Sequence, residues 1–257
     1  MPEDILTIPP PPADARVAYG ADASQFAELR LPKSKGPFPL VTNIHGGFWR
    51  AKYDLAHTGH LCAALTAKGI ATWNIEYRRV GNKGGGWPGT FEDVRNAYRY
   101  LAQIDKKYNL DLGKFLVMGH SAGGELALCL AAHEPAIKSV VSLAGVVDLK
   151  QAYDQHLSND AVVEFLGGTP SQVTEHYREA DPMEEPLPRS TVQWLIHGAG
   201  DDTVPSTFSR NYAQKKKASG EDVHYTEIST AGHFDLIDPR SRAWPTVEDT
   251  VRHLLGV

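Results

Sequence analysis

Cysteine, positive charge and long apolar runs are all scarce in this 257-residue sequence. The two cysteines, Cys62 and Cys129, form no C-x-x-C pair, so the sequence suggests no thiol metal site. We interpret them as buried free thiols in a reducing compartment. No stretch approaches the roughly 18 apolar residues of a membrane-spanning helix. The first twelve residues lack the basic start and apolar centre of a signal peptide. We therefore expect a cytoplasmic protein with no membrane partner.

The formal net charge is -5, from 26 basic and 31 acidic residues. Nucleic-acid binding needs a basic patch to neutralise phosphates. The one basic run, at 215–217, is interpreted as a solvated helix face. The composition thus argues against a nucleic-acid partner.

Strand and helix patterns alternate along the chain, which favours an α/β fold with a mostly parallel central sheet and helices on both faces. The length is typical of a single domain, residues 1–257. From about 148 to 188 the alternation breaks into short helical pieces and prolines, and this stretch is too long for a simple connection. We interpret it as a small helical cap insertion. Strands are expected at 17–19, 25–31, 40–44, 70–75, 115–118, 137–143, 191–196 and 223–228, and helices at 55–68, 91–107, 122–133, 206–218 and 243–255.

The sequence Gly-His-Ser-Ala-Gly at 119–123 lies between a short apolar run and a helical pattern. A serine between a buried strand and a helix, with glycine two residues to either side, is the nucleophile-elbow pattern. Side chains at the glycine positions would collide with neighbouring backbone, and the turn strains the serine. Because such a pentapeptide occurs by chance in roughly one chain in ten of this length, its context must support it. The pattern predicts Ser121 as a nucleophile.

A serine nucleophile needs a histidine base and an acid that orients the histidine. In this topology they follow in the order acid, then histidine, on loops after later strands. The loop after the strand at 191–196 carries Asp201 and Asp202, and the loop after the strand at 223–228 carries His233. His233 is therefore the predicted base.

An acyl-transfer site also needs two backbone N–H donors for the oxyanion. One is expected from Ala122, which follows the nucleophile, and the other from the loop His-Gly-Gly-Phe-Trp at 45–49. Either Gly47 or Phe48 supplies the second amide, and the residues leave that choice open. Trp49 is interpreted as a core anchor of this loop.

These motifs together resemble those of the α/β-hydrolase superfamily over essentially the whole chain. The sequence at 45–49 is similar to the His-Gly-Gly-x-Trp signature of the kynurenine formamidase and carboxylesterase group, and 119–124 to its elbow. The stretch His-Gly-x-x-Asp-x-x-Val-Pro at 197–205 resembles the acid loop of related esterases, which implies that Asp201 is the acid. One departure is Glu125, where relatives often carry histidine.

Several other residues could belong to a functional site, and for most of them we favour a structural role. The glycine-rich stretch at 84–89 does not sit close enough to a strand for a nucleotide site. Trp87 is a candidate either for the pocket mouth or for packing of its loop, and His120 a candidate substrate contact. His57 and His60 are three residues apart and could share a metal ion, but no third ligand is evident, so we interpret them as a surface pair. Glu76 reads as part of a buried ion pair that orders the loop at 45–49.

The combined expectation is a serine hydrolase that cleaves a small-molecule ester or aryl-formamide through an acyl-enzyme, without metal or cofactor. Two alternatives remain: a peptidase of the prolyl-oligopeptidase type, and a non-catalytic ligand-binding protein on a hydrolase scaffold. The oligomeric state is left open between monomer and homodimer.

Overall fold

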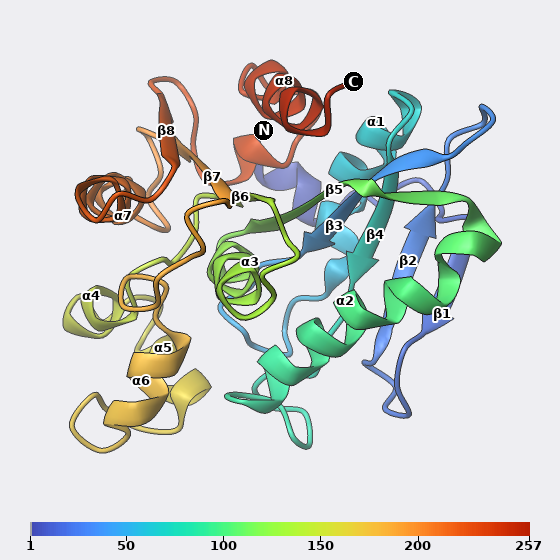
Figure 1. Ribbon diagram of the computed structural model, residues 1–257. Coiled ribbons are helices and arrows are strands. Elements are labelled where there is room, and N and C mark those ends of the chain that lie inside the picture. Colours follow the sequence, from blue (N-terminus) through green and yellow to red (C-terminus); the bar gives the residue numbers. More distant parts are fainter. Residues whose placement is uncertain (1) are drawn as a thin grey trace.

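The computed structural model describes residues 2–257, and within that range eight strands form one sheet. The strands are β1 Ala15–Ala18, β2 Phe26–Arg30, β3 Phe38–Ile44, β4 Ala71–Ile75, β5 Leu110–His120, β6 Ser139–Leu143, β7 Val192–Gly198 and β8 Val223–Ile228. Their order across the sheet is β1-β2-β4-β3-β5-β6-β7-β8 (Figure 1). Only the pairings of β1 with β2 and of β2 with β4 are antiparallel among these strands. The predicted α/β architecture with a mostly parallel sheet is confirmed.

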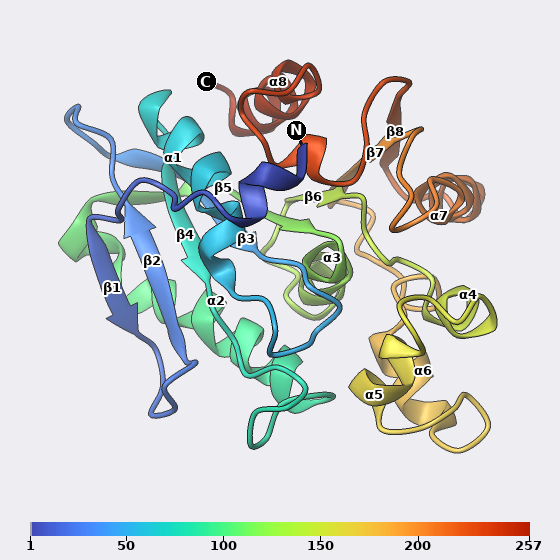
Figure 2. The same ribbon diagram turned by 180° about the vertical axis from the view of Figure 1, so that it is seen from behind.

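Helices cover both faces of the sheet (Figures 1 and 2). Three of them pack on one face, and these are α2 Gly89–Tyr108, α3 Ala122–His133 and α7 Thr207–Ala218. Two pack on the other face, and these are α1 Gly59–Ala67 and α8 Trp244–Leu255. Each face therefore has its own apolar core.

The central strands contribute to both cores in alternation. In β5, Val117 packs in the core under α2 and α3, whereas Leu116 and Met118 pack in the core under α1 and α8. Successive side chains of a strand point to opposite faces. A strand buried on both faces is mostly apolar, which explains the short apolar runs of the sequence.

The segment 148–188 holds three short helices, α4 Leu149–Asp154, α5 Ala161–Leu166 and α6 Thr174–Ala180. Both ribbon views show them grouped together at one corner of the molecule, beyond α3 (Figures 1 and 2). Phe165 and Tyr177 are each at most 1% exposed and belong to the core that includes α3. The segment is thus packed against the body of the fold.

Two local features differ from the expected elements. The helix expected at 55–68 is a 3-10 turn, η2 Leu55–Thr58, followed by α1. The Asp54 side chain caps the start of the turn by accepting from the Ala56 amide at 2.9 Å. A further 3-10 turn, η1 Pro2–Leu6, precedes the proline-rich arm and was not expected. Ile5 of this turn is 1% exposed and packs in the core of α1 and α8.

The basic run at 215–217 is not wholly a solvated face. Lys216 is buried, and its ammonium group donates to the carbonyl of Glu185 at 2.6 Å and lies 3.6 Å from Glu221. Burial lowers the pKa of Lys216, although the Glu221 carboxylate opposes the shift. Consecutive helical residues point in different directions, so one of three adjacent lysines can face inward.

Candidate active site

Ser121 sits in a strained turn between β5 and α3. Its backbone angles are φ 57° and ψ -121°, a left-handed conformation that is costly for a residue with a side chain. A Cβ atom on Gly119 would lie 1.9 Å from the carbonyl oxygen of Gly123, and one on Gly123 would lie 2.1 Å from that of Ile44. Only glycine fits at these two positions, as the sequence pattern predicts.

His233 and Asp201 lie on the loops that follow β8 and β7, and the structure brings them into contact. The Nδ1 atom of His233 lies 2.7 Å from Oδ2 of Asp201, and both side chains are at most 3% exposed. This bond places the proton on Nδ1 and leaves Nε2 free to accept one. The geometry is that of a base and its orienting acid.

The Asp201 carboxylate is held on every side. Its Oδ1 atom accepts from the amides of Thr203 and Val204 at 2.9 and 2.8 Å, and Oδ2 also lies 3.2 Å from Nε2 of His197. Burial alone would raise the pKa of Asp201, but the hydrogen bonds from His197, His233 and Val204 outweigh it and hold the pKa well below its ordinary value. The group therefore stays ionised across the neutral range.

The loop at 45–49 runs beside Ser121 with three successive positive φ angles, 113° at Gly47, 50° at Phe48 and 56° at Trp49. Gly47 and Phe48 both line the cavity that contains Ser121. The Ala122 amide is the first of α3, and such an amide has no intrahelical acceptor. These are the amides expected to face an oxyanion.

The loop is anchored from behind by Glu76. Its carboxylate lies 3.1 Å from Nε2 of His45 and 3.2 Å from Nε of Arg79, and it accepts from the Leu55 amide at 3.1 Å. Burial would raise the pKa of Glu76, but His45 and Arg79 outweigh this and lower it. The predicted buried ion pair is present, and its cationic partner is Arg79.

A cavity of about 310 Å³ opens in front of Ser121 and His233. Its apolar wall is formed by Leu6 from the N-terminal turn and by Phe48 and Phe234. Phe234 begins a 3-10 turn, η3 Phe234–Leu236, directly after His233. The cavity thus combines the predicted nucleophile and base with a small apolar surface.

Histidines and hydroxyl groups form the polar wall of the same cavity, which is lined by Tyr53, His57, His120 and Thr203. The Nε2 atom of His120 lies 3.0 Å from the His233 carbonyl oxygen and can only donate to it. Burial, followed by the neighbouring histidines, lowers the pKa of His120 well below its ordinary value. His120 therefore lines the cavity as a neutral ring, and its contact with substrate stays a prediction.

His57 corrects the sequence interpretation. It is 8% exposed and lines the cavity, whereas His60 Nε2 donates to the Ile8 carbonyl at 3.0 Å on the outer side. Burial, assisted by His45, lowers the pKa of His57 to about 3, so its ring is neutral. The two histidines are not a surface pair.

Trp87 is a second correction. It does not line the cavity; its ring stacks on Phe91 at 5.2 Å and meets Phe165 edge-on at 6.1 Å. Its amide donates to the Phe165 carbonyl at 2.8 Å. Of the two roles considered, packing of its loop is the one observed.

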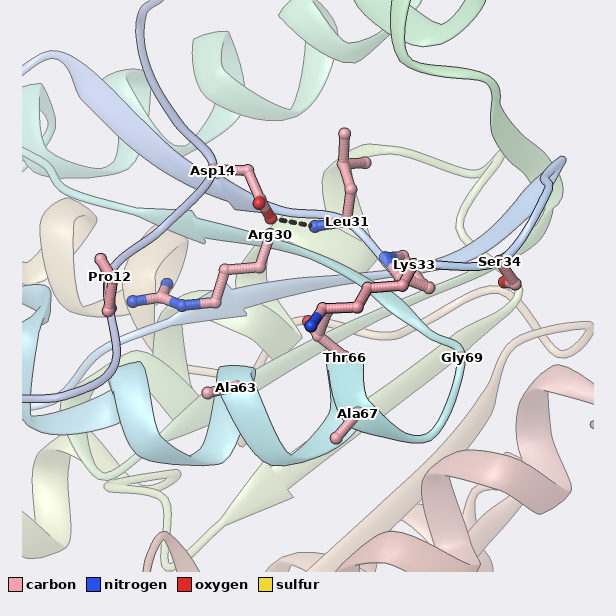
Figure 3. Close-up of a pocket in the computed structure, with 11 residues that line it drawn as sticks. Pro12, Asp14, Arg30, Leu31, Lys33, Ser34, Ala63, Thr66, Ala67 and Gly69 are labelled. Carbon is pink, nitrogen blue, oxygen red and sulfur yellow. Dashed lines mark hydrogen bonds between the residues drawn. The ribbon is translucent and has the colours of Figure 1, made fainter.

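A larger cavity of about 580 Å³ lies near the β2 end at Arg30 (Figure 3). Arg30 pairs in the sheet with Thr72, near the start of β4, so this cavity lies at the end of the sheet opposite Ser121. The Lys33 side chain points across it toward Thr66. None of the residues predicted for chemistry lines it.

Two further properties bear on function. Within residues 2–257 no three histidine, cysteine or acidic side chains are grouped so that they could hold a metal ion. Over the same range no helix has the length and apolar character needed to cross a membrane.

Glu125 is a buried acid directly behind the elbow, on α3. It is 0% exposed, and burial raises its pKa to about 8 despite the hydrogen bond from Trp49 and the contact with Cys129, with Asp181 adding to the rise. Asp181, near Asp148, is also buried, and its pKa is raised to about 7. At neutral pH Glu125 is therefore largely protonated.

This predicts that the contribution of Glu125 to stability falls between pH 5 and 8. The folded state keeps the Glu125 proton up to about pH 8, while the unfolded chain loses it near pH 4.3. At this group the folded state binds more protons in this window, so its share of the free energy of unfolding decreases as pH rises. Glu125→Gln cannot ionise, so the free energy of unfolding of the wild type should fall relative to that of Glu125→Gln as the pH rises from 5 to 8. Urea unfolding at pH 5, 6.5 and 8 measures this, and equal slopes for both proteins would contradict it.

Comparison with known proteins gives the family. The family model described as BD-FAE matches residues 28–215, well over half of the chain. The chain belongs to the BD-FAE family. The matched region of this BD-FAE chain contains the loop at 45–49, Ser121 and Asp201, while His233 lies beyond it.

Curated relatives of the BD-FAE chain carry esterase names. Esterase LipC of Mycobacterium tuberculosis is 28% identical over 90% of this chain and 62% of its own length. Versiconal hemiacetal acetate esterase of Dothistroma septosporum is 28% identical over 63% of this chain and 54% of its own length. Probable isoprenylcysteine alpha-carbonyl methylesterase ICMEL1 of Arabidopsis thaliana is 24% identical over 93% of this chain and 55% of its own length. The chain thus spans between about half and two thirds of the length of these relatives.

Solved structures establish the α/β-hydrolase fold of the BD-FAE chain. A truncated carbohydrate esterase from gut microbiota superposes with a TM-score of 0.82 at 21% identity, covering 96% of this chain and 99% of that one. Esterase B from Lactobacillus Rhamnosis gives a TM-score of 0.82 at 18% identity, and the superposition covers 98% of this chain and 89% of that one. The predicted superfamily is confirmed, whereas no comparison points specifically to kynurenine formamidase.

Proposed function

We propose that this protein is a serine carboxylesterase that cleaves small esters through an acyl-enzyme. The observation that carries the proposal is the His233–Asp201 hydrogen bond of 2.7 Å beside a cavity that also contains the strained Ser121. A histidine fixed at Nδ1 by a carboxylate can take a serine proton at Nε2. The esterase names of the curated relatives support the same class of reaction.

In the proposed reaction His233 removes the Ser121 proton as the hydroxyl oxygen attacks the ester carbonyl carbon. Negative charge develops on the carbonyl oxygen, and the amides of Ala122 and of Gly47 or Phe48 stabilise it. His233 then gives its proton to the leaving alcohol. Water repeats the sequence on the acyl-enzyme and releases the acid.

The size of the cavity favours small substrates. A volume of about 310 Å³ is at the lower end for ligand pockets. We expect short acyl esters to be cleaved best, with N-formyl anilides and dipeptide amides as weaker substrates or none. A panel of p-nitrophenyl esters from acetate to dodecanoate, beside N-formylkynurenine and a dipeptide anilide, tests this. Turnover of the peptide or formamide above every ester would overturn the ester assignment.

Leu6 should limit the length of the acyl or alcohol group, because it closes the apolar side of the cavity together with Phe48 and Phe234. Leu6→Ala removes three carbons from that wall. Each additional buried methylene is worth about 0.8 kcal/mol, or roughly fourfold in binding. The ratio of kcat/KM for octanoate over acetate should rise about 4- to 20-fold.

Ile8→Ala is the matched control, since Ile8 belongs to the same N-terminal arm but is 38% exposed. It should leave the chain-length profile of p-nitrophenyl esters unchanged. If Leu6→Ala and Ile8→Ala gave the same profile as the wild type, Leu6 would not be part of the substrate wall.

A further inference from the structure

The backbone of the loop at 45–49 cannot hold its shape by itself. Gly47 adopts its φ of 113° freely, but Phe48 and Trp49 pay a steric cost at 50° and 56°. Such strained residues persist only where surrounding contacts fix them. The loop carries the Gly47 and Phe48 amides, so whatever fixes it also fixes the proposed oxyanion donors.

The Trp49 side chain is held from two directions. Its indole Nε1 donates to Oε2 of Glu125 at 2.9 Å, and its ring stacks on Phe165 with centroids 4.4 Å apart and planes at 4°. Trp49 is only 1% exposed. Glu125 belongs to α3, which starts at the nucleophile, and Phe165 belongs to α5 of the segment 148–188.

Glu125 is also connected to the segment 148–188, through Cys129. Cys129 Sγ lies 2.9 Å from the Ala180 carbonyl and 3.3 Å from Oε1 of Glu125. A thiol has one proton, and the Ala180 carbonyl can only accept it, so the contact with Glu125 is satisfied by a proton on the carboxyl. A hydrogen-bonded chain therefore runs from Trp49 through Glu125 and Cys129 to Ala180, at the end of α6.

The residue after Trp49 is attached to the segment as well. Arg50 donates to both carboxylate oxygens of Glu164, at 2.8 and 3.0 Å, and to the Ser158 hydroxyl at 3.1 Å. A bidentate arginine–carboxylate pair fixes orientation better than a single contact. The loop and the segment 148–188 are thus joined at two consecutive residues.

No residue of the segment 148–188 lines the cavity of Ser121. We propose that this segment acts on the reaction from behind: Glu125 and Phe165 clamp Trp49, and the clamp positions the Gly47 and Phe48 amides toward the oxyanion. Glu125 is then a positioning residue for turnover. The inference rests on the proposed esterase function and extends it to a residue that does not touch substrate.

Glu125→Leu and Glu125→Gln form the central experiment. Leucine leaves the Trp49 N–H without an acceptor, so the loop relaxes, and kcat should fall about 10- to 100-fold while KM changes less than about threefold. Glutamine accepts from Trp49 with its oxygen and donates to Cys129 with its NH₂ group, so kcat should stay within about threefold of the wild type. An unchanged kcat in Glu125→Leu, or a Glu125→Gln as impaired as Glu125→Leu, would overturn the inference.

Trp49→Phe tests the same bond from the other side. It removes the indole N–H but keeps a ring that can stack on Phe165. We expect a loss of kcat similar to that of Glu125→Leu, and a double variant no worse than the poorer single variant, because both changes break one interaction. Losses that multiply in the double variant would show that the two residues act independently and would refute the clamp.

The chain offers a matched control in α8. Trp244 donates to Oε2 of Glu248 at 3.0 Å, the same type of bond on the opposite face of the sheet from Trp49, and neither residue lines the cavity of Ser121. Glu248 also pairs with Lys68 at 2.8 Å. Glu248→Leu should lower Tm, as Glu125→Leu does, but leave kcat within about twofold of the wild type. A comparable fall of kcat in Glu248→Leu would mean that kcat reports general stability only, which would remove the inference.

Failure of the proposed function is distinguishable from failure of the clamp. A wild-type protein that turns over no ester and reacts with no phosphonate would remove both. A wild-type esterase whose Glu125→Leu variant has normal kcat would overturn the clamp alone.

Discussion

Ser121→Ala should lower kcat for p-nitrophenyl acetate by about 10⁴- to 10⁶-fold while leaving the fold intact. His233 and Asp201 remain in place in this variant, but no hydroxyl is left to form the acyl-enzyme. Alanine has the same Cβ atom as serine, so the turn with φ 57° meets no new steric contact. The residual rate would come from the amides and the cavity alone.

The experiment combines kinetics with covalent labelling. An organophosphonate should modify the wild-type protein once, on the tryptic peptide 115–138, in which Ser121 is the only serine. Ser142→Ala is the control, because its hydroxyl is buried without a hydrogen-bond partner on the neighbouring strand β6. Its removal should leave both kcat and labelling unchanged. Labelling on another peptide, or a Ser121→Ala variant within tenfold of the wild type, would reject Ser121 as the nucleophile.

The elbow and the loops after β7 and β8 could be predicted from sequence because their causes are local. Gly119 and Gly123 are required by contacts below 2.2 Å that any side chain would make. The ends of β5 and β7 that lead to two of these turns are largely buried between the two faces of the sheet, whereas β8 is a partly exposed edge strand. Chain order then brings Ser121, Asp201 and His233 to the same edge.

The walls of the cavity could not be predicted because they depend on tertiary placement. Leu6 reaches the site only because the N-terminal turn packs back beside η3 Phe234–Leu236, far away in sequence. His57 and His60 are three residues apart, which on one regular helix puts them on one face. The change from the 3-10 turn to α1 at Gly59 separates them.

The sequence contains a sign that Glu125 is important, although Glu125 belongs to none of the motifs considered above. It is the only charged residue between Ala122 and Leu130, in a helix whose residues from 122 to 131 are all buried. Such an acid must be neutral or paired. Its partner, Trp49, lies 76 positions earlier, so the sequence could indicate that a partner exists but not which one.

Asp201→Asn should lower kcat by up to about 10⁴-fold with little effect on the fold. The Oδ1 atom of Asp201 accepts from the amides of Thr203 and Val204, so the single amide oxygen of asparagine is best used there. The NH₂ group then faces Nδ1 of His233, 2.7 Å away in the wild type. An N–H donor at this position requires Nδ1 to be the acceptor. The ring proton moves to Nε2, and His233 can no longer take a proton from Ser121.

Asp202→Asn is the matched control, one residue further along the same loop. Asp202 is exposed, and its side chain accepts only from the Thr203 hydroxyl, at 3.3 Å, among the contacts of the described chain. The following helix, α7, begins only at Thr207, too far from Asp202 for a helix-dipole effect, which is confined to the first turn. Both kcat and Tm should therefore stay near the wild-type values. Measuring kcat and Tm for the two variants tests the assignment of the acid directly. If Asp202→Asn lost most of its kcat while Asp201→Asn kept a nearly normal kcat, Asp202 would be the catalytic acid, contrary to the geometry around His233.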